Sequence, residues 1–257
     1  MIKNLLESYK NGEIDLEEAE EKIMKILYEQ GEDFFLDMHR HRRTGFPEVI
    51  LTEGKSTEQM LEIVRNFLEV NGCAFVSNHD EEKENALRNA FSGVQIKKAG
   101  RLMVIGQSDK PGEKFGTVGI ITAGTADVPY ARECVLLLKE TGAEVVEAFD
   151  LGVSGLHRPF FGIRKTKDTD VLIIFAGMDG ILPTMIASLT QKPVIAVPTP
   201  IGYGFGGRGE AALRTMLQSC VPGVVVMNIG NSVGAAAAAL RILKAIKRQE
   251  DVPDGET

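Results

Sequence analysis

The fold of this chain is decided by residues 170–198, which read DVLIIFAGMDGILPTMIASLTQKPVIAVP. The stretch holds two runs rich in Val and Ile without polar alternation, separated by an apolar segment of helical length. Strands of this kind are buried on both faces, which is typical of parallel sheets covered by helices. The stretch therefore predicts a strand, a helix and a parallel strand of an α/β domain.

The same alternation extends through residues 111–257. Further strands are predicted at TVGIIT, EVVEAF and GVVVMNI, with helices between them and an Ala-rich helix from Val233 at the end. The pattern predicts a doubly wound α/β fold with a parallel five-stranded sheet. In such sheets ligands bind at the carboxyl ends of the strands, where the strand order switches.

Residues 1–110 are predicted to form a separate, smaller α/β domain. They hold 21 of the 36 acidic residues. Asp15 is a candidate N-cap of one helix, and a second helix, STEQMLEIVRNFLEVNG, is stopped by Gly72 between two short strands. The turn-rich stretch GQSDKPGEKFG, residues 106–116, predicts a linker, which places the domain boundary near residue 110.

Composition excludes several classes of function. The net charge is -7 and no Lys/Arg run is longer than two, so nucleic acid is not an expected partner. No stretch reaches 18 uncharged apolar residues, and a membrane span is therefore not expected. Three cysteines without a paired spacing suit a reducing compartment, and we expect a cytoplasmic protein.

One basic cluster stands out in the acidic first part. The stretch DMHRHRRTGFPEVI places His39, Arg40, His41, Arg42 and Arg43 before a turn. Solvated charge is one interpretation. The other is an anion contact reaching toward the second domain, because arginine side chains suit phosphate and carboxylate.

The loops after the first two strands of the second domain carry candidate binding residues. In TAGTADVP, Gly124 permits a tight turn, and Thr125 and Asp127 lie at the start of a helix whose backbone N–H groups would hold a phosphate. Asp127 fits an N-cap or a ribose partner. In DLGVSGLHRP, His157 and Arg158 place a group that titrates near pH 7 beside a permanent cation.

Two later loops add a carboxylate and a glycine cluster. Asp179, in AGMDGILP, is either a helix cap or an active-site carboxylate. PTPIGYGFGGRGEAAL contains the pattern G-x-G-x-x-G from Gly204 to Gly209, but the next strand ends near Asn228 with no acid after it. We therefore reject a dinucleotide oxidoreductase fingerprint, and expect only that the backbone approaches an anionic or flat ligand there.

Cys220 differs from the other two cysteines. Cys73 and Cys134 lie in apolar runs typical of buried thiols, whereas Cys220 lies at a helix–strand junction, in MLQSCVPG. A helix C-terminus disfavours a thiolate, so a reactive Cys220 needs nearby cations. Arg158, Arg208 and Arg214 are the candidates.

Several motifs in order resemble the LarB family. They are DMHRHRRTGFPEVI, TAGTADVP, GVSGLHR, IIFAGMDGILP, PTPIGYG and MLQSCVPGVVVMNIGNSVGAA, and together they span most of the chain. The second domain is in turn similar to the PurE family of aminoimidazole ribonucleotide carboxylases and mutases, which implies a flavodoxin-like sheet. The PurE phosphate loop corresponds to AGTAD.

The LarB resemblance implies a reaction. Nicotinic acid adenine dinucleotide would be carboxylated on its pyridinium ring and cleaved at its phosphoanhydride, giving pyridinium-3,5-biscarboxylic acid mononucleotide and AMP, the first step of nickel-pincer cofactor synthesis. Cys220 aligns with the family's nucleophile, and a thiolate adduct would make the electron-poor ring nucleophilic. Asp179, with His157 as the other candidate, would remove the ring proton.

The resemblance also implies substrate contacts and partners. Thr125 and Asp127, with Gly124, would hold phosphate and ribose, and Arg158 would neutralise phosphoanhydride charge. The loop from Tyr203 through Gly204 and Gly206 to Gly207 would pack along the dinucleotide, with Asn228 beside it. Carbon dioxide or bicarbonate would be the co-substrate, no cofactor would be tightly bound, a magnesium requirement stays open, and a homo-oligomer built on the second domain is expected.

The sequence departs from the LarB pattern at four positions and in the glycine loop GFGGRGEA. Ala126 replaces a common serine, Asp179 a longer glutamate, and Gly230 and Ser232 the Asp and Gly of a typical NIDNG. Two alternatives therefore stay open. One is a PurE-type carboxylase or mutase, whose electron-rich aminoimidazole needs no thiol, and the other is a nucleotide-binding regulator without turnover.

Overall fold

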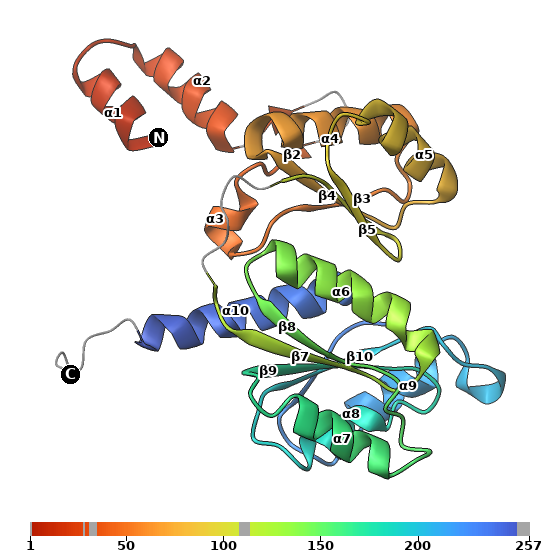
Figure 1. Cartoon of the computed structure of the whole chain (residues 1–257). Coiled ribbons are helices and arrows are strands. Elements are labelled where there is room, and N and C mark those ends of the chain that lie inside the picture. Colours follow the sequence, from red (N-terminus) through yellow and green to blue (C-terminus); the bar gives the residue numbers. More distant parts are fainter. Residues whose placement is uncertain (1, 28, 31–34, 108–113, 251–257) are drawn as a thin grey trace. The chain divides into compact units, whose positions relative to one another are not determined.

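A computed structural model describes residues 2–27, 29–30, 35–107 and 114–250 (Figure 1). The chain divides into two units, one of residues 1–97 with 103–109 and one of residues 98–102 with 110–257. The middle of the predicted linker, residues 108–113, lies outside the described residues. No helix in the described part of the chain combines the length and apolar character needed to cross a membrane.

The second unit is built on a five-stranded sheet in which every strand pair is parallel. Its strand order is β11-β10-β9-β7-β8. The strands are β7 (Thr117–Thr122), β8 (Glu144–Ala148), β9 (Val171–Ala176), β10 (Val194–Pro198) and β11 (Val224–Val226). The predicted doubly wound fold with a parallel five-stranded sheet is confirmed.

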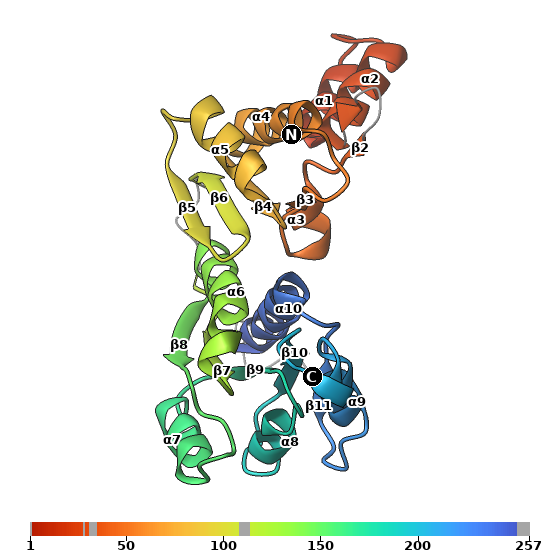
Figure 2. The same cartoon turned by 90° about the vertical axis from the view of Figure 1, so that its right-hand side faces the viewer.

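Helices cover both faces of this sheet. They are α6 (Val128–Glu140), α7 (His157–Lys165), α8 (Leu182–Ala187), α9 (Glu210–Leu217) and α10 (Ser232–Glu250). Figures 1 and 2 show α6 and α10 together on one face, with α7 and α8 on the other. All residues of β9 and β10 are buried as a result, which explains their continuous apolar sequences.

The strand order fixes where a ligand can enter. From β7 the chain passes to β8 on one side, and β9, β10 and β11 follow on the other side. The loops after β7 and β9 therefore diverge to opposite faces and leave a crevice at their carboxyl ends.

The Ala-rich segment of α10 packs inside the unit. Ala235, Ala236 and Ala239 are fully buried, and α10 lies against α6. Small side chains allow these helices to approach closely. The alanine run is therefore explained within one subunit and gives no support to the expected homo-oligomer.

The first unit contains a four-stranded sheet in the order β3-β4-β6-β5, in which β3 and β4 are parallel. Its strands are β3 (Val49–Leu51), β4 (Cys73–Ser77), β5 (Ile96–Ala99) and β6 (Leu102–Gly106). Its helices are α1 (Ile2–Lys10), α2 (Leu16–Leu27), α3 (Arg40–Thr44), α4 (Thr57–Asn71) and α5 (Glu81–Ala90), and β1 (Glu29–Gln30) pairs with β2 (Phe35–Leu36).

The predicted helix signals of this unit are confirmed. The Glu18 N–H donates to the Asp15 carboxylate at 2.8 Å, and Ser56 forms a capping box with Gln59 at the start of α4. Gly72 ends α4 in the left-handed conformation, φ +70°. Strands β5 and β6 were not predicted, although LMVIG of β6 is wholly buried.

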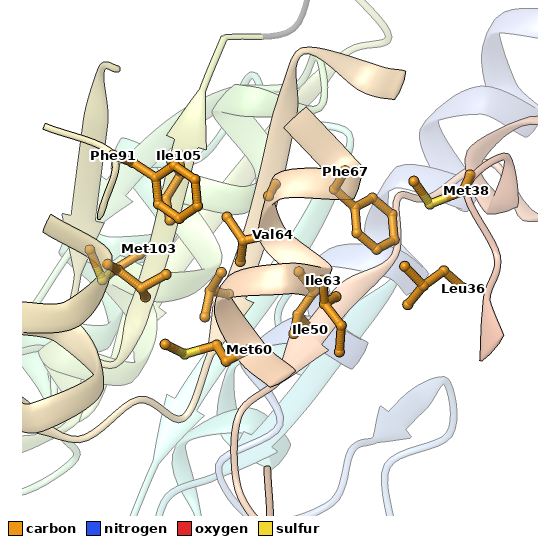
Figure 3. Packing of buried hydrophobic residues seen from close by; sticks show 13 residues of the cluster. Leu36, Met38, Ile50, Met60, Ile63, Val64, Phe67, Phe91, Met103 and Ile105 are labelled. Carbon is orange, nitrogen blue, oxygen red and sulfur yellow. The ribbon is translucent and has the colours of Figure 1, made fainter. Parts of the chain in front are cut away.

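The core of the first unit forms between α4 and the sheet (Figure 3). Met60, Ile63, Val64 and Phe67 of α4 are buried at three- and four-residue spacing. They pack in one cluster with side chains of the strands, among them Met103 of β6. The first unit therefore has its own hydrophobic core.

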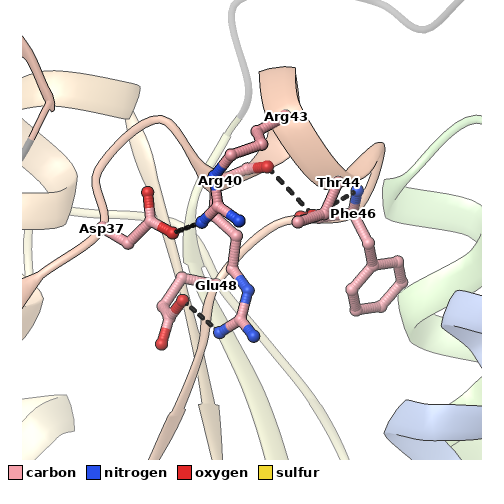
Figure 4. A network of polar contacts seen from close by, with 6 residues as sticks. All are labelled: Asp37, Arg40, Arg43, Thr44, Phe46 and Glu48. Atoms are coloured by element: carbon pink, nitrogen blue, oxygen red, sulfur yellow. Dashed lines mark hydrogen bonds and ion pairs between the residues drawn. The ribbon is translucent and has the colours of Figure 1, made fainter.

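The basic cluster pairs with carboxylates of its own unit (Figure 4). Arg40 forms an ion pair with Glu48, and Arg43 with Asp37. The Arg40 side chain is about half exposed and the Arg43 side chain is mostly exposed, which agrees with the solvated-charge interpretation. The anion contact toward the other domain stays a prediction.

Lys192 is expected to stabilise the turn between α7 and β9. Its Nζ donates to the carbonyl oxygens of Thr166, Lys167 and Thr169, the first at 2.8 Å. In Lys192→Met these acceptors lose their charged donor, which should lower the free energy of unfolding by about 2–3 kcal/mol. Urea denaturation followed by circular dichroism measures the change.

Lys139→Met is the matched control, because the Lys139 side chain is half exposed and forms a single ion pair with Glu147. It should change the free energy of unfolding by less than about 1 kcal/mol. Equal effects of the two substitutions would contradict the special role of Lys192.

Candidate active site

A cavity of about 470 Å³ opens at the carboxyl ends of β7, β8 and β9. It is lined by residues 123–127, 150, 152–154, 176–179, 181–182 and 201. These positions belong to the loops on both sides of the switch point between β7 and β9. The cavity thus lies where a doubly wound sheet binds its ligands.

The Asp127 carboxylate joins three strand ends beneath this cavity. Its Oδ2 accepts a hydrogen bond from the Gly124 N–H at 2.8 Å. Its Oδ1 accepts from the Gly177 N–H at 3.1 Å and from the Thr199 hydroxyl at 2.5 Å. Only 3% of the residue is exposed. Burial raises the pKa of this carboxyl, and the three donors partly offset that effect.

These contacts define what Asp127 does. The side chain caps no N–H group of α6 and turns back to Gly124 instead. Both oxygens are engaged within the protein, so the contacts assign Asp127 to positioning the loops. The predicted contact with ribose stays a prediction.

The loop after β7 forms the wall that sequence predicts for phosphate. Gly124 has an extended backbone, and a 3₁₀ turn, Thr125–Asp127, leads directly into α6. Thr125 and Ala126 are exposed and line the cavity. Their place at the start of a helix brings the positive end of its dipole to the cavity.

The loop after β9 is held in a strained conformation. Met178, a non-glycine residue, has φ +52°, and its N–H donates to the Ile201 carbonyl at 2.6 Å. Gly177 is required because a Cβ there would lie 2.4 Å from the same carbonyl oxygen. The arrangement carries Asp179 to the cavity, where it is exposed. Its one described hydrogen bond, from the Ile181 N–H, is long at 3.4 Å.

The loop after β8 contributes a residue that sequence analysis missed. Asp150 lines the cavity, and its Oδ2 lies 3.8 Å from Nη1 of Arg158. His157 and Arg158 are exposed at the start of α7 and do not line the cavity. Asp150 could have been found, because it is a polar residue directly after a predicted strand.

The glycine loop lies mostly outside the cavity. Ile201 lines it, whereas Tyr203 is 79% exposed in the free chain. A 3₁₀ turn, Gly204–Gly206, and Gly207 follow, and neither lines the cavity. Asn228 is exposed, and its side chain accepts from the Ile229 N–H at 2.9 Å. The predicted contacts of this loop with a dinucleotide therefore require a ligand that extends beyond the cavity.

Cys220 is the exposed cysteine, in the loop between α9 and β11. It does not line the cavity. The neighbouring Ser219 hydroxyl accepts from Thr184 of α8 at 2.9 Å, and Leu182 at the start of the same helix lines the cavity. Cys134 is fully buried, which raises the pKa of its thiol and makes it inert. Within the described residues, no three or more His, Cys, Asp or Glu side chains form a metal-binding group.

Comparisons with known proteins match both units. A LarB/PurE-like N-terminal domain model matches residues 28–107, and an AIR carboxylase model matches residues 117–251. An uncharacterized protein of Methanocaldococcus jannaschii is 37% identical over 257 residues, which cover 96% of this chain and 98% of that protein.

Two further relatives are enzymes by name. The N5-carboxyaminoimidazole ribonucleotide mutase of M. jannaschii is 35% identical over 136 residues, 52% of this chain and 81% of that enzyme. The phosphoribosylaminoimidazole carboxylase of Candida albicans is 27% identical over 213 residues, 76% of this chain and 36% of that enzyme.

Asp127→Ala should destabilise the protein strongly. The substitution leaves the Gly124 and Gly177 N–H groups and the Thr199 hydroxyl without their acceptor, and we expect a loss of at least about 3 kcal/mol in the free energy of unfolding. Asp179→Ala is the control, because its exposed carboxylate should change that free energy by less than about 0.5 kcal/mol. Chemical denaturation of both variants tests the difference, and equal midpoints would disprove it.

Proposed function

This chain belongs to the LarB family, and on that premise we propose that it carboxylates the pyridinium ring of nicotinic acid adenine dinucleotide and cleaves its phosphoanhydride. Its second domain is of the PurE-related carboxylase and mutase type. Dinucleotide, carbon dioxide and water would give pyridinium-3,5-biscarboxylic acid mononucleotide and AMP. The observation that carries the proposal is the cavity at the switch point, with the Gly124 loop and Asp179 in its wall, in a chain that also has the LarB N-terminal domain.

The ring chemistry requires a nucleophile from the protein. A pyridinium ring is electron-poor and does not attack carbon dioxide. Addition of the Cys220 thiolate to the ring converts it to an enamine, whose carbon then forms the new bond to carbon dioxide. A base removes the proton from that carbon, and the returning electron pair restores the aromatic ring and expels the thiolate.

The proposed role of Cys220 requires the ring to bind near the α9–β11 loop. The thiol is exposed and therefore accessible, and the contact between Ser219 and Thr184 ties its loop to the helix that begins at the cavity wall. A dinucleotide is long enough to extend past the cavity. We place the pyridinium ring toward the α8 side, between Asp179 and the α9–β11 loop.

Asp179 is the base that the geometry favours. Its carboxylate is exposed to the cavity, and the one hydrogen bond described for it leaves acceptor positions for a proton. His157 is exposed but does not line the cavity. We therefore retain Asp179 as the residue that removes the ring proton.

The phosphates would bind between the β7 loop and Arg158. Backbone N–H groups near Thr125 and the positive end of α6 attract an anion. Arg158 would neutralise charge that develops when the phosphoanhydride breaks. Tyr203 and the glycine loop would then contact the part of the dinucleotide outside the cavity. Carbon dioxide or bicarbonate is the co-substrate in this proposal, with no tightly bound cofactor and a homo-oligomeric enzyme.

A PurE-type reaction is the second candidate. The 35% identity to an N5-carboxyaminoimidazole ribonucleotide mutase over 136 residues favours it. An aminoimidazole ring is already electron-rich and needs no thiol. Retention of carboxylase or mutase activity on an aminoimidazole ribonucleotide by Cys220→Ala would support this candidate.

Incubation with nicotinic acid adenine dinucleotide and ¹³C-bicarbonate tests the proposed reaction directly. We expect equimolar AMP and a mononucleotide carrying the labelled carboxylate, identified by mass spectrometry. Parallel reactions with magnesium and with EDTA determine whether a divalent cation is needed. Dinucleotide binding without AMP release, with or without magnesium, would instead indicate a regulator.

Two substitutions test the assigned roles. Cys220→Ala should abolish labelling of the ring, because no nucleophilic carbon forms. Asp179→Asn should slow it by a factor of about 10² or more, as expected for loss of a general base. Intact-protein mass spectrometry should detect a thiol–ligand adduct in Asp179→Asn. Cys73→Ser is the control thiol and should retain activity, whereas loss of labelling in His157→Asn but not in Asp179→Asn would move the base to His157.

A further inference from the structure

Asp150 has a backbone conformation that side chains other than glycine rarely adopt. Its φ is +60°, and it lies two residues after β8 in the cavity wall. Such conformations require fixed contacts around them. Here the Asp150 N–H donates to the Thr122 hydroxyl at 2.9 Å, and the Leu151 N–H donates to the Thr122 carbonyl at 2.8 Å. Thr122 is fully buried at the end of β7, so the sheet itself holds Asp150 in place.

The next loop directs Arg158 toward this carboxylate. Arg158 Nη1 lies 3.8 Å from Asp150 Oδ2. The arginine side chain passes over Gly155, where a Cβ would lie 3.4 Å from its Nε and 3.5 Å from its Cδ. The Arg158 N–H also donates to the Gly155 carbonyl at 2.9 Å. The backbone and the side chain of Arg158 therefore both contact the loop between Asp150 and Arg158.

We infer that Asp150 is a positioning residue that holds the Arg158 guanidinium at the edge of the cavity for the phosphoanhydride of the substrate. The inference rests on the proposed function for the identity of that anion. One contact to Asp150 occupies one side of the guanidinium and leaves other N–H groups to donate to phosphate. A held arginine loses less side-chain freedom when it binds, which strengthens binding.

The chemistry of the pair argues against a role in stability alone. Both side chains are nearly half exposed, 47% for Asp150 and 44% for Arg158. Ion pairs this exposed contribute little to folding. A left-handed backbone at the cavity wall thus carries a side chain that adds little stability, and glycine would occupy the position with less strain.

Two substitutions separate the carboxylate from the backbone. Asn tolerates the left-handed region, and Gly adopts it without strain. Asp150→Asn and Asp150→Gly therefore keep the loop and remove the charge. We expect both variants to bind inorganic pyrophosphate about tenfold more weakly by calorimetry. With the dinucleotide, KM for AMP release should rise about tenfold with kcat changed less than about twofold, while the melting temperature of Asp150→Gly does not fall.

A double-mutant cycle tests whether Asp150 acts through Arg158. Adding Asp150→Asn to Arg158→Ala should cause no further loss of pyrophosphate binding. Asp168→Asn is the matched control, because Asp168 forms an exposed ion pair of 3.9 Å with Lys167 outside the cavity. It should behave as the wild type.

Each outcome bears on the inference separately from the proposed function. Unchanged pyrophosphate binding in both Asp150 variants, additive losses with Arg158→Ala, or absence of pyrophosphate binding by the wild type would overturn it. A wild type that binds pyrophosphate in an Asp150-dependent manner but releases no AMP would support the inference while refuting the proposed reaction.

Discussion

One buried carboxylate organises the cavity of this protein. The loops after β7, β9 and β10 each provide one donor to Asp127, through Gly124, Gly177 and Thr199. Hydrogen bonds to a buried charged acceptor are stronger than those between neutral groups, and an unmet donor here would be costly. The three loops that form much of the cavity wall are therefore held as one body, although their sequences lie up to 72 residues apart.

Rigid loops matter because the proposed reaction requires several protein groups to be held at fixed positions around the substrate. Asp179 and the Gly124 loop reach the cavity from two neighbouring strands, and both depend on the Asp127 contacts for their positions. Strain at Met178 is tolerated in the same region. Such a site is shaped before the ligand arrives, which reduces the entropy lost on binding.

The sequence was sufficient to predict the second domain almost completely. Runs such as VLIIFA and VIAVP admit one interpretation, since uninterrupted apolar strands between helices need cover on both faces. In the first domain the N-cap signal of Asp15 and the helix stop at Gly72 were equally informative. The two paired strands in KKAGRLMVIG, β5 and β6, were not predicted. Strand β5 is short and half polar, and only its pairing with β6 makes it a strand.

Prediction of the site was less complete, for a physical reason. The cavity lies at several of the loops that the sequence analysis selected. Sequence alone does not show that the Asp127 carboxylate is bound within the protein, because its partners Gly177 and Thr199 lie far along the chain. It also could not show that the glycine loop and Cys220 lie outside the cavity. The internal contacts of Asp127 and the positions of the glycine loop and Cys220 both depend on how the loops are arranged in three dimensions.

Glycine and alanine make up 6 of the 16 described residues that line the cavity, and no arginine, lysine or aromatic side chain is among those 16. Its outline therefore depends in part on the backbone of its loops, whereas the chemical groups that it offers a ligand come from a small number of replaceable side chains. In such a fold, point substitutions of these side chains can change the reaction that is catalysed while the backbone keeps its shape. Relatives that share this sheet could therefore diverge in chemistry well before they diverge in form.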